Sequence, residues 1–141
     1  MSNPINPNII KYRSGYKFQL ADTYYVDIGA DLETLAVTKF IALDGRRLVI
    51  SAGYAWDGPS GPTFASKSSM RASLVHDALY QLLREGHPPP TLRGFADDLL
   101  YAMCVEDGMW KWRAAMWRRA VKKFAGFAAD PANIKQVLEA P

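Results

Sequence analysis

The chain has 141 residues, of which 49% are hydrophobic and 22% are charged, and its formal net charge is +3. This balance predicts one globular domain with a sizeable core, and so mild a charge gives no reason to expect nucleic-acid binding. The longest apolar runs fall far below the ~20 residues that span a bilayer, and residues 1–7 have neither the basic end nor the apolar stretch of a secretion signal. We therefore expect synthesis in the cytoplasm, with no signal peptide or transmembrane segment.

The first part of the chain, about residues 9–55, is rich in β-branched and aromatic residues that often alternate with polar ones. This pattern predicts a small antiparallel β-sheet with strands at 16–20, 23–28, 35–42 and 48–51. Between the last two strands stands Asp44-Gly45, a pair that favours a tight hairpin.

From about residue 56 to 141 the spacing of apolar residues becomes helical. Helices are predicted at about 67–85, 91–106 and 109–127, with a short tail helix near 131–138. The Gly/Pro-rich segment 86–90 separates the first two. No internal repeat is visible, so residues 1–141 are predicted to form a single α+β domain, with a small N-terminal antiparallel sheet followed by three main α-helices.

The first two helices carry polar side chains within apolar sequence. His76 and Tyr80 lie one helical turn apart and share a face, whereas Asp77 points about 100° round from His76. Asp97 and Tyr101 follow on the next helix. If the helices meet, Asp97 could fix the tautomer of His76 and leave Asp77 free to bind a cation. This layout is typical of a catalytic site.

Upstream of these helices, the loop 54–63 is rich in residues that turn the backbone and expose its carbonyl groups. The loop residues considered as oxygen donors are Asp57, Gly58, Ser60 and Gly61. Hard cations prefer carboxylate and backbone oxygens, so this loop together with Asp77 predicts an oxygen cage for Ca²⁺.

The succession of a Gly/Pro loop, a His-Asp-x-x-Tyr motif, a short Gly/Pro connection and an Ala-Asp pair resembles the core of secreted phospholipases A2. The similarity covers about residues 54–103 and is closest to the disulfide-free version in the unique region of the parvovirus capsid protein. The matching residues are His76, Asp77, Ala78, Leu79, Tyr80, Gly86, Pro88, Ala96, Asp97, Asp98, Leu99 and Leu100.

This resemblance implies a phospholipase A2-like helix pair and Ca²⁺-dependent hydrolysis of phospholipid esters at a membrane. His76 would be the general base that activates water, and Asp97 would orient it. Tyr80 and Tyr101 would steady the carboxylate of Asp97. The metal ligands implied are Asp77 and carbonyl oxygens of the loop from Gly58 to Gly61, and the ion would stabilise the oxyanion.

The whole chain also resembles a phage and prophage family, domain of unknown function 1353. Its pattern of aromatic-x-Asp-Gly-Ala-Ser-x-Pro matches residues 56–62, except that Pro59 stands where alanine is usual. In that family the Asp57 position is favoured, either as an extra metal ligand or as a turn former. The resemblance implies a phage protein, with incorporation in a virion as one expected fate.

The chain departs from the secreted lipases in two respects. It has a single cysteine, Cys104, so its helices must be held by a core instead of disulfides, and helical spacing favours a buried position for this thiol. Pro59 and Pro62 restrict φ in the loop predicted to wrap the metal.

The third helix carries three tryptophans and six basic residues, with no acidic residue, between positions 109 and 124. One interpretation is a membrane or partner surface that binds anionic lipid or phosphate. The residues assigned to it are Trp110, Trp112, Trp117, Arg118, Arg119, Lys122 and Lys123. The other interpretation is a core helix with a solvated basic back, in which residues 110, 117, 121 and 124 share the apolar face.

Two other functions stay open. A structural virion protein of the tail or baseplate would use His76, Asp77 and Asp97 as a polar clasp between helices and would bind other phage proteins. Another metal-dependent hydrolase would use Asp57, His76 and either Asp77 or Asp97 as ligands of a transition metal. The second histidine, His87, lies in a Pro-rich turn and is expected to be exposed.

Overall fold

The computed structural model describes residues 10, 12–13, 18–29, 35–56, 58, 67–86 and 92–129. Strands come first and helices follow, so the predicted α+β class is confirmed. The strands are β1 (Tyr12–Arg13), β2 (Phe18–Leu20), β3 (Tyr24–Asp27), β4 (Leu35–Val37), β5 (Ile41–Asp44), β6 (Arg47–Ile50) and β7 (Ala55–Trp56). The helices are α1 (Lys67–Arg84), α2 (Leu92–Glu106) and α3 (Lys111–Ala129). The tail helix predicted near 131–138 lies outside the described residues.

The strands form two antiparallel sheets rather than the single sheet predicted. In the described part of the chain, one sheet has the order β1-β2-β7 and the other the order β3-β6-β5-β4. The predicted strand 35–42 is wrong, because Thr38 turns the chain: its backbone N–H donates to the Ile41 carbonyl at 2.8 Å. Residues 35–44 therefore form the hairpin of β4 and β5.

The hairpin predicted at Asp44-Gly45 is confirmed. Asp44 is the last residue of β5 and pairs with Arg47, which leaves Gly45 and Arg46 as a two-residue loop. Gly45 has φ of 58°, a left-handed conformation that glycine adopts without a Cβ penalty.

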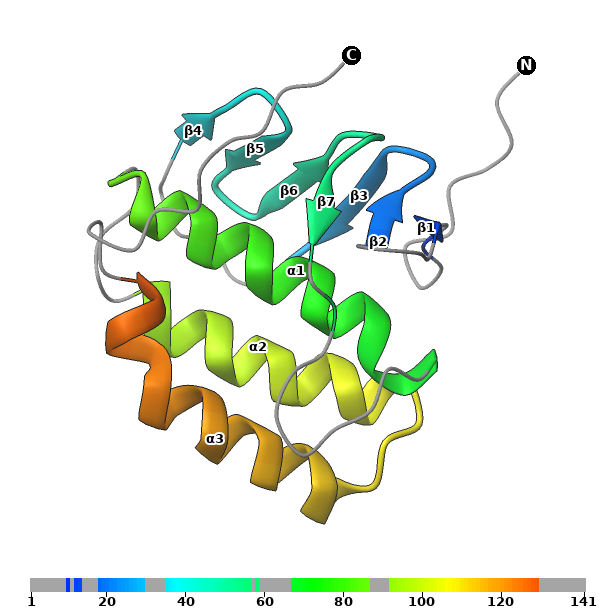
Figure 1. The fold of residues 1–141 in the computed structure, drawn as a ribbon, viewed down its shortest axis with the longest axis vertical. Coiled ribbons are helices and arrows are strands. Elements are labelled where there is room, and N and C mark those ends of the chain that lie inside the picture. Colours follow the sequence, from blue (N-terminus) through cyan, green and yellow to red (C-terminus); the bar gives the residue numbers. More distant parts are fainter. Residues whose placement is uncertain are drawn as a thin grey trace.

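Helix α1 is the central element of the fold. The two sheets lie on one side of it, and α2 and α3 lie on the other, each helix antiparallel to the next (Figure 1). Between Ser69 and Arg84 every residue of α1 is buried except Asp77 and Gln81, which are half-buried. A helix covered on both sides needs apolar residues around most of its circumference, and this explains why α1 has no wide polar face.

The core joins both halves of the chain. Leu43, Leu48 and Ile50 of the larger sheet are fully buried, as are Leu74 and Leu79 of α1. Within the described residues, none of the helices has the length and apolar character needed to cross a membrane.

Candidate active site

The side chains of His76 and Asp97 meet between α1 and α2. His76 Nε2 lies 2.8 Å from Asp97 Oδ1, and the Tyr80 hydroxyl donates a hydrogen bond to the same oxygen at 2.5 Å. The rings of His76 and Tyr80 also contact each other, with centroids 4.2 Å apart. Because His76 and Tyr80 occupy successive turns of α1, both reach one carboxylate of α2. We call these three residues the His76 cluster.

The His76 cluster is buried, but one nitrogen of the imidazole points toward a more open neighbour. Only 9% of His76 and 1% of Asp97 are exposed. A neutral imidazole that donates from Nε2 to a carboxylate keeps its lone pair on Nδ1. Nδ1 lies 3.8 Å from the carboxylate of Asp77, whose side chain is 29% exposed. This separation is too long for a direct hydrogen bond, and an ionised carboxylate has no proton to donate, so Asp77 does not occupy the lone pair of Nδ1.

The pKa values of both His76 and Tyr80 are raised, and the consequence differs for the two side chains. Burial lowers the pKa of His76, but the carboxylates of Asp77 and Asp97 outweigh it and raise the pKa above its ordinary value. Burial raises the pKa of Tyr80, and its hydrogen bond to Asp97 raises it further. His76 is therefore a stronger base than a free imidazole, and Tyr80 stays a hydrogen-bond donor.

The start of the predicted metal loop is fastened to α1 one turn before Asp77. Trp56 Nε1 donates to Ser73 Oγ at 3.0 Å. Gly58 is buried with φ of +81°, and a Cβ at this position would lie 2.3 Å from the Phe18 ring. Packing against Phe18 thus requires glycine at position 58. The other predicted loop ligands, Asp57, Ser60 and Gly61, lie outside the described residues, as does His87.

Tyr101 is not brought into the His76 cluster. In the described part of the chain no hydrogen bond joins it to Asp97; its half-buried ring instead faces α3, with the Arg118 guanidinium 4.3 Å from the ring centroid. Arg118 and Lys122 approach Asp98 at 3.8 and 3.3 Å. Tyr101, Arg118 and Lys122 therefore belong to the contact between α2 and α3.

The aromatic residues predicted to share one face at the start of α3 are separated by the fold. Trp117 is 3% exposed and lies in the core, so its assignment to a surface is wrong. Trp110 precedes α3 and is 72% exposed, and Trp112 is 61% exposed. Their ring centroids lie 6.3 Å apart. Further along, the exposed basic residues include Arg119, Lys122 and Lys123.

A second buried polar cluster was missed by the sequence analysis. Arg71 of α1 donates from Nε and Nη2 to the Asp107 carboxylate at 2.9 and 2.8 Å, and from Nη1 to the Tyr24 hydroxyl at 3.2 Å. Burial lowers the pKa of Arg71, but these partners outweigh it and raise the pKa. The available signal was Arg71 itself, a charged residue on the apolar stripe that continues through Val75 and Leu82.

Cys104 is buried, as predicted. Burial raises the pKa of its thiol to about 12, which is inconsistent with a nucleophilic role.

Among the described residues there is no group of three or more histidine, cysteine, aspartate or glutamate side chains able to hold a metal ion. Comparison with models of protein families, with curated proteins and with solved structures finds no match for this chain.

Proposed function

We propose that this chain hydrolyses phospholipid esters, with α1 and α2 as a phospholipase A2-like helix pair. The observation that carries the proposal is the contact of His76 Nε2 with Asp97 at 2.8 Å, which leaves Nδ1 as the basic atom. A water held at Nδ1 would lose a proton to it while its oxygen attacks the ester carbonyl. The same proton would then pass from Nδ1 to the departing alkoxide, so no serine or cysteine nucleophile is required.

The surroundings of His76 favour this use. The imidazolium formed in the first step is positively charged, and the carboxylate of Asp97 at 2.8 Å and that of Asp77 at 3.8 Å would both stabilise it. Tyr80 would hold Asp97 in place through its hydrogen bond. Tyr101 would act less directly, by packing on the α3 side of α2.

The donor set near His76 suits a hard cation better than a transition metal. The described residues offer Asp77 as a partly open carboxylate, and the remaining ligands would have to be backbone oxygens of the loop from Gly58 to Gly61, which calcium accepts. Ca²⁺ bound there would polarise the ester carbonyl. Asp57 and Ser60 would be further oxygen donors of the same loop.

An anionic membrane is the proposed partner surface. Trp110 and Trp112 present adjacent exposed rings, and tryptophan is favoured where one part of a surface is apolar and another is wet. Arg119 and Lys123 add positive charge along α3, whereas Arg118 and Lys122 belong to the contact with Asp98. Trp117 is left out of this surface because it is buried.

The test is hydrolysis of fluorescent phospholipid in anionic vesicles, with Ca²⁺ or with EGTA. His76→Gln removes the base and should lower the rate by about 10²–10⁴-fold. Asp77→Asn removes a proposed Ca²⁺ ligand, so the rate with Ca²⁺ should fall to the rate measured with EGTA. Asp98→Asn is the matched control, because Asp98 is a 61% exposed carboxylate on the α3 side of α2. Absence of fatty acid release under both conditions, with all variants folded, would contradict the proposal.

The second candidate is a phage structural protein of the virion, in keeping with the resemblance to the phage family. The observation in its favour is that His76, Tyr80 and Asp97 are buried and connect two helices, so they could serve only as a clasp. A clasp predicts that His76→Ala lowers the melting temperature strongly, whereas catalytic residues often tolerate replacement without loss of stability. Because His76 contacts buried Asp97 under either proposal, the melting curve has to be combined with the vesicle assay: strong destabilisation by His76→Ala together with no fatty acid release by the folded wild type would favour the clasp.

A further inference from the structure

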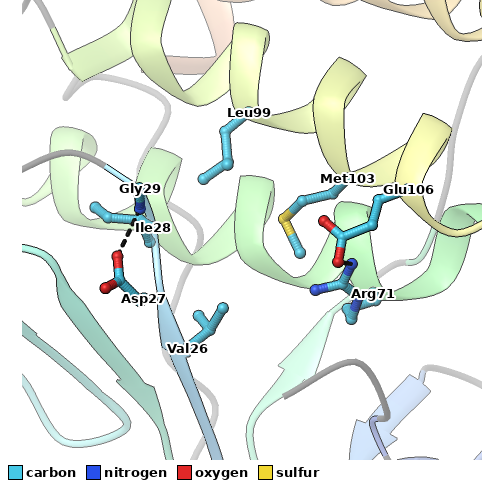
Figure 2. A pocket seen from close by; sticks show the side chains of 8 residues that line it. All are labelled: Val26, Asp27, Ile28, Gly29, Arg71, Leu99, Met103 and Glu106. Atoms are coloured by element: carbon cyan, nitrogen blue, oxygen red, sulfur yellow. Dashed lines mark hydrogen bonds and ion pairs between the residues drawn. The ribbon is translucent and has the colours of Figure 1, made fainter.

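A pocket of about 290 Å³ lies between the end of β3 and α2 (Figure 2). Its lining residues are Val26, Asp27, Ile28, Gly29, Arg71, Leu99, Met103 and Glu106. At about 100° per residue, Leu99 and Glu106 leave α2 on the side opposite Asp97. The pocket is therefore separate from the His76 cluster, and what it binds does not depend on the proposed hydrolase function.

The middle of the pocket is apolar and its ends are charged. Side chains of Val26, Leu99 and Met103 point into the space between β3 and α2 (Figure 2). Asp27 lies at one end, and Glu106 lies at the other end beside Arg71 (Figure 2). Most small-molecule sites have this composition, an apolar lining with a few polar groups that fix orientation.

The charges at the ends favour a cation over an anion. The one guanidinium in the lining, Arg71, already forms a two-bond pair with Asp107, so its charge is balanced. Both oxygens of Asp27 also have partners: Oδ1 accepts from the Gly29 backbone N–H at 2.7 Å and Oδ2 from Arg46 Nε at 2.9 Å. Among the described residues, the carboxylate of Glu106 has one contact, with Arg71 at the longer distance of 3.4 Å, and its side chain is 58% exposed.

We propose that this pocket binds a small molecule with an apolar ring or short chain and a protonated amine, the amine lying beside Glu106. An anion in the same place would face the carboxylates of Glu106 and Asp27, and it would be attracted only weakly by Arg71, whose charge is balanced by Asp107. The volume fits a ligand of this class, since a cavity of about 150 Å³ accommodates benzene and the pocket is roughly twice that size.

The test uses three soluble probes of similar shape that differ in charge: 2-phenylethylamine, 2-phenylethanol and phenylacetate. Binding is followed by the NMR methyl signals of Met103, Leu99 and Ile28. The amine should shift these signals with a dissociation constant of about millimolar, as usual for a ligand this small. The alcohol should bind more weakly and phenylacetate most weakly.

Two variants locate the site. Glu106→Gln should weaken amine binding by about threefold, the scale of a partly exposed ion pair, while Asp98→Asn, on the α3 side of α2, makes the same charge change and should leave it unchanged. Val26→Phe should fill the pocket and remove the shifts. The proposal would be overturned if phenylacetate shifted these signals as much as the amine or more, or if the amine still shifted them in Val26→Phe. It would also be overturned if the amine gave no shifts at a concentration of about 10 mM, roughly tenfold above the expected dissociation constant.

Discussion

The hydrogen bond from Tyr80 to Asp97 provides the sharpest test of the His76 cluster. Tyr80→Phe removes only the hydroxyl, which donates to Asp97 Oδ1 at 2.5 Å, and leaves the ring contact with His76. Because 3% of Tyr80 and 1% of Asp97 are exposed, water cannot readily replace the lost donor. A hydrogen bond to a charged group contributes about 1.5–3 kcal/mol. We expect Tyr80→Phe to lower the free energy of unfolding by about 2 kcal/mol.

This loss translates into a measurable shift of the melting temperature. At about 2.1 cal/mol/K per residue, unfolding a chain of 141 residues has an entropy of about 0.3 kcal/mol/K, so 2 kcal/mol corresponds to about 7 °C. Urea titration with linear extrapolation gives the free energy directly, and the slope with denaturant should stay constant. The loss should also appear in the absence of any substrate or metal.

Tyr101→Phe is the matched control for Tyr80→Phe. Tyr101 is a half-buried tyrosine whose described contact is the Arg118 guanidinium over its ring, so losing its hydroxyl should change the free energy of unfolding by less than about 0.5 kcal/mol. A loss below about 0.5 kcal/mol for Tyr80→Phe, or equal losses in the two variants, would refute the geometry of the His76 cluster.

Four further outcomes are expected. Asp107→Asn should cost about 2–3 kcal/mol in urea titration, because it replaces the charged two-bond partner of buried Arg71 and leaves only the longer Glu106 contact as a negative charge. Gly58→Ala should cost about 2 kcal/mol or more, since its Cβ would lie 2.3 Å from the Phe18 ring and its φ is +81°. Native Cys104 should resist Ellman's reagent at pH 8 until the chain unfolds, because burial raises its pKa to about 12. The contribution of Cys104 to the free energy of unfolding should fall as pH rises above about 8.5, because the unfolded thiol ionises there while the native thiol stays protonated.

Matched controls separate these effects from general damage. Glu106→Gln removes the charge of a side chain that is 58% exposed, so it should lower the free energy of unfolding by less than about 1 kcal/mol. If Asp107→Asn lowered it by no more than Glu106→Gln does, the buried pair of Arg71 and Asp107 would be contradicted. Gly86 has φ of +76°, and no described atom lies within 4 Å of a Cβ at this position. Gly86→Ala should therefore lower the free energy of unfolding by only about 1 kcal/mol, the cost of a left-handed backbone conformation for alanine. Rapid labelling of native Cys104 would contradict its burial.

Local patterns along the sequence determined most of the secondary structure. Apolar spacing and the Gly/Pro segment 86–90 placed α1 and α2 within one residue of their ends, and α3 within two. The turn at Asp44-Gly45 could also be predicted from the sequence, because the conformation of a two-residue loop depends mainly on the residues in the loop. The strand predicted at 35–42 failed because the turn there depends on hydrogen bonds between Thr38 and Ile41, which a β-rich composition does not reveal.

Sequence by itself determined the fold class, and helical spacing put His76 and Tyr80 on one face of a helix. Asp97 was selected as the carboxylate that could fix the tautomer of His76. Tertiary structure alone decided that Asp97 meets both rings while Tyr101 faces α3, and that Trp117 is buried while Trp110 is exposed. The physical reason is that spacing sets directions within a helix, whereas contact between helices depends on how their side chains pack at a shared interface. The pairing of Arg71 with Asp107 likewise arises where α1 meets the end of α2.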